Sequence, residues 1–157
     1  MIKHLNCDIF DSGADVICHQ VNCQGVMGGG LAKQVKERHP EVYESYIGYI
    51  KFCKRQQQQP LGTYTFAKAF GTNYWVLNIF GQDDYGRDRQ HTDYDALRNA
   101  LLTARNSVLG KKITIAFPYK MGCDRGGGDW NVVYDMIREI FADQEGDILI
   151  CEYHPEF

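Results

Sequence analysis

Residues 14–31 read ADVICHQVNCQGVMGGGL, a short apolar run that passes directly into a glycine-rich segment. The apolar run at 14–21 is typical of a strand buried on both faces of a sheet. The glycines at 28–30 permit backbone conformations that other residues rarely adopt, and Leu31 begins a helical pattern. A strand, a glycine turn and a helix in this order form the local unit of an α/β fold with parallel strands.

Strand-like and helical segments alternate along the rest of the chain. Apolar and β-branched runs predict strands at residues 2–5, 14–21, 63–70, 74–80, 113–118 and 147–153. Apolar side chains three and four positions apart predict helices at residues 30–38, 41–55, 92–109 and 129–142. We therefore expect one domain over residues 1–157, with an α/β fold built as a three-layer α/β/α sandwich around a mixed, mostly parallel sheet.

The composition argues against several classes of protein. A formal net charge of −3 over 157 residues argues against nucleic acid as a partner, because no strongly basic surface is guaranteed. No apolar run approaches the roughly 20 residues of a membrane span, and the first residues lack the apolar core of a secretory signal. The six cysteines contain no CxxC pair, so we expect reduced thiols, no metal site and a cytoplasmic location. We also expect a monomer without a cofactor.

A second glycine-rich segment, MGCDRGGGDW at residues 121–130, follows the predicted strand at 113–118 and begins the last predicted helix. Both glycine loops would lie at the carboxyl ends of parallel strands, where free N–H groups and the helix dipole favour phosphate. Neither loop has the GxGxxG or GxxxxGK[ST] pattern. Each could be only a flexible connector, but two such loops, both opening helices, favour a diphosphate held between them.

The order and spacing of these segments resemble the macrodomain family over nearly the whole chain. The resemblance rests on residues 7–10 (CDIF), 14–32, 117–123 (FPYKMGC) and 126–130 (GGGDW). It is closest to the branch with terminal ADP-ribose protein glycohydrolase and yeast ADP-ribose 1''-phosphate phosphatase, in which the Asn-Ala-Ala-Asn motif is altered; residues 19–22 read HQVN here. The resemblance implies ADP-ribose, or a derivative of it, as the ligand.

The resemblance also implies roles for individual residues. Asp8 would accept a hydrogen bond from the adenine amino group beside the Ile9 amide, unless it only caps a turn. Asn22 would hold the distal ribose, with an Asx turn at the end of the strand as the alternative. The other implied ligand-binding residues belong to the first loop (Val26, Gly28, Gly29, Gly30 and Leu31) and to the second (Met121, Gly122, Cys123, Arg125 and Gly126). Trp130 is expected in the core.

Catalysis is harder to read from the sequence. The glycohydrolase branch uses a lysine near the end of the strand that corresponds to residues 74–80, but residues 81–89 contain no lysine and the nearest is Lys68. The glycohydrolase branch also uses an acidic residue in the second loop, and matching of loop lengths places that position at Gly126 in this sequence. His19 as acid or base and Asp124 as the group that orients water are the catalytic candidates. His19 could instead be a core residue with its hydrogen bonds satisfied, and Asp124 a residue that only caps a helix start.

We expect hydrolysis of an ADP-ribose derivative: the 1''-phosphate, an acylated form or an ADP-ribosylated acceptor. Two other functions stay open. One is a module that binds ADP-ribose without chemistry, which the absent lysine favours. The other is a binder of a different phosphoanion or of nucleic acid on a similar fold.

Overall fold

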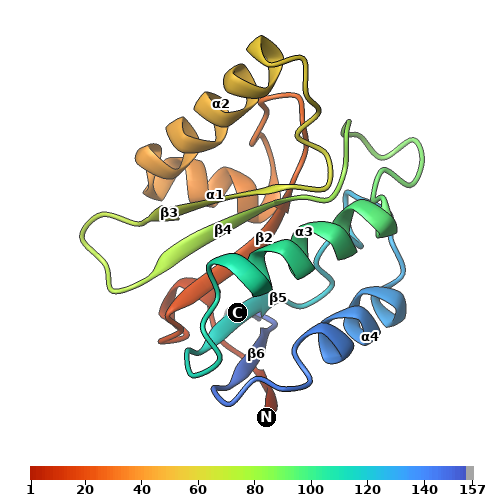
Figure 1. Ribbon diagram of the computed structural model, residues 1–157. Helices are drawn as coiled ribbons and strands as arrows, with labels where there is room; N and C mark the ends of the chain where they lie inside the picture. Colours follow the sequence, from red (N-terminus) through yellow and green to blue (C-terminus); the bar gives the residue numbers. More distant parts are fainter. Residues whose placement is uncertain (155–157) are drawn as a thin grey trace.

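The computed structural model describes residues 1–154, in which six strands form one sheet in the order β1-β6-β5-β2-β4-β3 (Figure 1). The strands are β1 (Ile2–Leu5), β2 (Val16–Val21), β3 (Tyr64–Lys68), β4 (Trp75–Phe80), β5 (Ile115–Pro118) and β6 (Ile148–Cys151). All neighbours are parallel except β3, which runs antiparallel to β4. The predicted mixed, mostly parallel sheet is confirmed; residues 155–157 of the predicted single domain lie outside the described part.

Helices cover both faces of the sheet, which confirms the three-layer sandwich (Figure 1). α1 (Gly30–Arg38) and α2 (Pro40–Arg55) pack on one face, and α3 (Tyr94–Ser107) and α4 (Trp130–Ile140) pack on the other. A short 3₁₀ helix, η1 (Ile9–Asp11), follows β1. Within residues 1–154, no helix combines the length and the apolar composition that crossing a bilayer requires.

The helix starts differ from expectation by one or two residues, and capping explains the difference. α3 was expected from residue 92 but begins at Tyr94, because the Asp93 carboxylate accepts the Ala96 N–H at 3.0 Å. α4 likewise begins after Asp129, whose side chain accepts the Asn131 N–H at 2.9 Å. α2 begins one residue early at Pro40, since proline fits the first helical position.

The two faces of the sheet have different cores. Under α3 and α4 lies one continuous apolar cluster, against which Trp130 packs as expected. Under α1 and α2 there are two clusters, one around Ile17 and the other around Val21, which lie four residues apart on β2. Side chains two residues apart on a strand share a face, so the residue between them, His19, separates the two clusters.

A row of polar side chains crosses three strands at this place. His19 on β2 lies opposite Asn78 on β4, which lies opposite Thr65 on β3, and all three are buried. Asn78 Nδ2 donates to Thr65 Oγ1 at 3.0 Å, so Asn78 Oδ1 accepts from His19 Nε2 at 2.5 Å.

Parallel pairing of β2 with both β4 and β5 brings the carboxyl ends of these three strands to one edge of the sheet (Figure 1). The segments that follow them are residues 22–29, 81–93 and 119–129. Both glycine loops therefore lie at this edge, with the segment after β4 beside them.

Candidate functional site

A cavity of about 430 Å³ lies at the carboxyl edge of β2, β4 and β5. Its walls come from the end of β2 and the first glycine loop, from residues after β4, and from the second glycine loop after β5. Cavities of this size are typical of sites for small-molecule ligands and cofactors. In the sheet order, β4 lies on one side of β2 and β5 on the other, so the strand order switches at β2. The carboxyl ends of the strands at such a switch point are the usual ligand position in open α/β sheets.

Most of the residues predicted for the site line this cavity. Both catalytic candidates, His19 and Asp124, do so. The predicted ligand-binding residues in the wall are Asn22, Val26, Gly28, Gly29, Gly30, Leu31, Met121, Gly122, Arg125 and Gly126. Asp8, Ile9 and Cys123 are described by the structure but are not among the lining residues.

Nine other residues line the cavity without having been predicted as site residues: Gln20, Val21, Ala32, Gln82, Tyr85, Gly86, Pro118, Tyr119 and Lys120. Three of them belong to the segment after β4, and its position directly after a parallel strand was the available signal. Lys120 adopts a left-handed backbone conformation, with φ of 61°, which is uncommon for any residue but glycine. A lysine therefore does border the cavity, although on the second loop rather than after β4.

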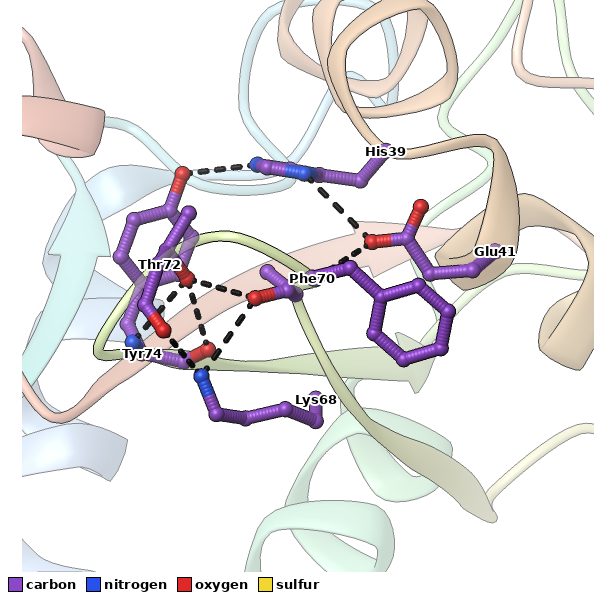
Figure 2. Close-up of polar contacts among 7 residues, drawn as sticks. His39, Glu41, Lys68, Phe70, Thr72 and Tyr74 are labelled. Carbon is purple, nitrogen blue, oxygen red and sulfur yellow. Dashed lines mark hydrogen bonds and ion pairs between the residues drawn. The ribbon is translucent and has the colours of Figure 1, made fainter.

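Lys68, the lysine nearest to β4 in sequence, is not among the residues that line the cavity, and Figure 2 shows its side chain extending toward the turn that contains Thr72. Its ammonium donates to the carbonyl oxygens of Thr72 and Ala69 in the turn between β3 and β4. Lys68 pairs with Trp75 at the start of β4, whereas the cavity lies beyond the end of that strand. The same turn is fixed to α2, because Glu41 accepts the Phe70 N–H at 2.7 Å.

Asn22 organises the first glycine loop. Its Oδ1 accepts the Gln24 N–H at 2.9 Å and the Tyr46 hydroxyl at 2.9 Å, and its Nδ2 donates to the Val26 carbonyl at 2.8 Å. This is the Asx turn considered as an alternative to ribose binding. The hydrogen-bonding capacity of Asn22 is thus largely used within the loop.

Backbone amides remain free on both loops. Among residues 1–154, the N–H groups of Gly28, Gly29 and Gly30 find no acceptor, and α1 adds its positive dipole end at Gly30. The N–H groups of Gly122, Asp124, Arg125 and Gly126 in the second loop also lack an acceptor there. The second-loop carbonyls of Gly122 and Gly126 instead accept hydrogen bonds from the protein. Two sets of free amides across a cavity are suited to a diphosphate.

Arg125 joins the two loops across the cavity. A Cβ atom at Gly29 would lie 2.6 Å from Arg125 Nη1, so the guanidinium rests against the backbone of the first loop. No carboxylate within residues 1–154 forms an ion pair with Arg125. Its guanidinium is therefore free to bind a planar anionic group such as phosphate.

His19 is uncharged at neutral pH. Burial lowers its pKa to about 4, and the hydrogen bond to Asn78 offsets this only in part. With the proton on Nε2, the buried Nδ1 carries a lone pair and has no partner among residues 1–154. His19 could thus act as a weak base but not as a cationic acid.

The two loops each contain one cysteine, and both of these cysteines are poor nucleophiles. Burial, with Asp83 nearby, raises the pKa of Cys23 to about 12. Burial and the charge of Asp129 raise the pKa of Cys123 to about 11. Both are therefore neutral thiols at pH 7 rather than reactive thiolates.

Asp8 is engaged within the chain. Its Oδ1 accepts the Phe10 N–H at 3.1 Å and caps η1, which is the capping role considered as an alternative. Its Oδ2 lies 3.6 Å from Arg38 Nη2, whose guanidinium carbon lies 4.2 Å from the centre of the Phe10 ring. Binding of an adenine amino group to Asp8 stays a prediction.

The chain is similar to proteins of known family. The Macro domain family model matches residues 18–137. A DNA ADP-ribosyl glycohydrolase from Thermus aquaticus is 26% identical over an alignment of 158 positions, which covers 99% of this chain and 41% of that protein. An ADP-ribose 1''-phosphate phosphatase from Candida glabrata is 29% identical over 84 residues, with 50% of this chain and 45% of that protein covered. The chain thus matches less than half of the length of either relative.

Solved structures agree with the fold. The macrodomain of Mycobacterium tuberculosis DarG superposes with a TM-score of 0.76 at 25% identity, over 99% of both chains. Thermosipho africanus DarTG in complex with ADP-ribose superposes with a TM-score of 0.77 at 21% identity, over 99% of this chain and 42% of that one.

Proposed function

Because this chain belongs to the macro domain family, we propose that its cavity binds ADP-ribose and that the protein hydrolyses an ADP-ribose derivative. The observation that carries the proposal is the pair of glycine loops with free amides on either side of a cavity of about 430 Å³. Relatives named as a glycohydrolase and as a phosphatase support a hydrolase of this type.

In the proposed complex, the diphosphate lies between the two loops. The free amides of Gly29 and Gly126 would donate to phosphate oxygens, and the Arg125 guanidinium would neutralise part of the charge. These groups are held by the backbone or lie beside it, so they need little rearrangement when a ligand binds.

For the chemistry, we propose that Asp124 orients or activates a water molecule. Asp124 lines the cavity and is exposed, so its carboxylate can reach a ligand. A covalent lysine intermediate formed by a residue after β4 is disfavoured, because residues 81–89 contain no lysine and Lys68 is bonded elsewhere. The same observation favours the second candidate function, an ADP-ribose-binding module without catalysis.

One set of assays tests both candidates. Calorimetric titration with ADP-ribose measures binding, and hydrolysis is followed on ADP-ribose 1''-phosphate, O-acetyl-ADP-ribose, an aspartate- or glutamate-ADP-ribosylated peptide and ADP-ribosylated DNA. We expect binding and turnover of at least one substrate. Binding without turnover at high protein concentration would establish the non-catalytic module, and failure to bind ADP-ribose would contradict both.

The Asp124→Asn variant separates chemistry from binding. It keeps the size and polarity of an exposed side chain but removes the charge and basicity. We expect turnover to fall about 100-fold or more, while ADP-ribose affinity changes by less than about threefold. Unchanged turnover would exclude Asp124 from the chemistry.

A further inference from the structure

Residues 81–92, which we call the bridging segment, connect the two glycine loops. On the first-loop side, the Asp83 carbonyl accepts the Cys23 N–H at 2.9 Å and the Gln24 side-chain amide at 3.1 Å. On the second-loop side, the Gly126 carbonyl accepts the N–H groups of His91 and Thr92 at 2.8 and 2.9 Å. The bridging segment therefore contacts both loops while it contributes part of the cavity wall.

Gln20 anchors this segment to the central strand. Its Nε2 donates to Gln82 Oε1 at 2.7 Å and to Thr92 Oγ1 at 2.8 Å, and so holds both ends of the bridging segment. Thr92 Oγ1 then donates to the Gly122 carbonyl at 2.6 Å. A continuous chain of hydrogen bonds thus runs from β2 through the bridging segment to the second loop.

The backbone is packed tightly onto these side chains. A Cβ atom at Gly122 would lie 2.9 Å from Gln20 Oε1, and one at Gly81 would lie 2.8 Å from Gln20 Cδ. A side chain at either position would displace the Gln20 carboxamide, and Gly122 also has a left-handed backbone conformation, with φ of 74°, that favours glycine. Gln20 Oε1 has no N–H or O–H partner within residues 1–154 and is enclosed by this glycine backbone.

We propose that Gln20 and Thr92 are positioning residues, which hold the second loop in its ligand-binding arrangement before a ligand arrives. The Thr92 hydroxyl, which Gln20 holds in place, donates to the Gly122 carbonyl beside the Gly128 N–H, while the N–H groups of Gly122, Asp124, Arg125 and Gly126 stay free among residues 1–154. A loop fixed in advance loses less conformational entropy when it binds, which raises affinity without any new contact. The effect on ADP-ribose rests on the proposed function, whereas the order of the loop does not.

The Thr92→Val variant tests the proposal, because valine keeps the shape of threonine and removes the hydroxyl. In the absence of ligand, hydrogen exchange is followed for the peptide that covers residues 121–128, in which the N–H groups of Cys123, Gly127 and Gly128 are hydrogen-bonded. We expect exchange about tenfold faster than in the wild type and ADP-ribose affinity about tenfold lower. Thr92→Ser, which restores the hydroxyl, should return both values to near those of the wild type.

Thr103→Val is the matched control, since within the described residues 1–154 the Thr103 hydroxyl bonds only to the Asn99 carbonyl in α3. It should change neither value. Should Thr92→Val fail to fold, Gln82→Met, which removes one partner of Gln20, gives the same measurement with a smaller expected effect. Exchange at wild-type rates in a folded Thr92→Val or Gln82→Met protein would overturn the proposal.

The experiment also distinguishes this proposal from the proposed function. If the wild type does not bind ADP-ribose but the variant exchanges faster, the proposed ligand is wrong and the positioning role stands. If the wild type binds and serine fails to restore either value, the positioning role is wrong and the ligand stands.

Discussion

Substitution of alanine for Gly126 adds a single methyl group to the second loop, and we expect it to reduce the affinity for ADP-ribose. The added Cβ would lie 2.6 Å from the Gly122 carbonyl oxygen, whereas ordinary contact begins near 3.4 Å. The loop must therefore open by the difference, 0.8 Å, because its neighbour here is backbone rather than a flexible side chain. The same Cβ would collide with the Thr92 hydroxyl, which bonds to Gly122.

A displacement of this size moves amides out of reach of the phosphate oxygens. Loss of one or two charge-assisted hydrogen bonds costs about 3 kcal/mol, which corresponds to roughly a 100-fold loss of affinity. Calorimetric titration with ADP-ribose measures this loss, and circular dichroism with thermal unfolding verifies that the variant is folded at the assay temperature.

Gly48→Ala is the matched control. Gly48 lies inside α2, and a Cβ there would meet no atom within 4 Å. Alanine favours helix over glycine by about 1 kcal/mol, so the unfolding temperature should rise while affinity stays unchanged. Wild-type affinity in Gly126→Ala, or an equal loss in Gly48→Ala, would refute the reasoning.

His19 has a pKa near 4 when folded against about 6.5 when unfolded, so the unfolded state takes up the proton first and its contribution to folding stability should fall by about 3 kcal/mol as pH drops from 6.5 to 4. Chemical denaturation should show this fall in the wild type and a smaller one in His19→Gln, in which His39, whose pKa burial also lowers, still contributes. Lys120→Gly removes a left-handed non-glycine residue, so the unfolding temperature should not decrease, while loss of the cation should weaken ADP-ribose binding severalfold in titrations; a large drop in stability would show that the lysine side chain supports the fold. Lys68→Met should leave ADP-ribose affinity and turnover at wild-type values in the same assays, because its ammonium bonds to a turn remote from the cavity; lost turnover would return it to the list of catalytic candidates.

The elements of the fold were predictable because their signals are local. Every predicted strand and helix is found, since apolar periodicity reports burial directly. The helix boundaries were less predictable where a side chain near the helix start forms a hydrogen bond with a distant part of the chain. Thr92 fits a helix start by type, yet its hydroxyl bonds to Gly122, thirty residues away in sequence, and Asp93 becomes the cap.

The parts of the site that depend on local sequence patterns were predictable, and the long-range contacts were not. Glycine loops after strands are local patterns, and both loops border the cavity. The bond from Gln20 to Thr92 joins residues 72 positions apart, which no local pattern encodes. The role of Asp8 could not be decided from its residue type, because capping a turn and binding a ligand amino group both require a short carboxylate at this position.

The buried polar row of His19, Asn78 and Thr65 has a consequence for how the chain folds. Within residues 1–154, β3 pairs only with β4, so its register depends on contacts with this one strand, on the turn that joins them and on packing against the helices. A slip by a single residue would carry Thr65 to the opposite face and leave the Asn78 amide buried without an acceptor, at a cost of about 1–3 kcal/mol. The buried polar row thus favours the correct register of β3, mainly because it raises the free energy of the shifted pairings.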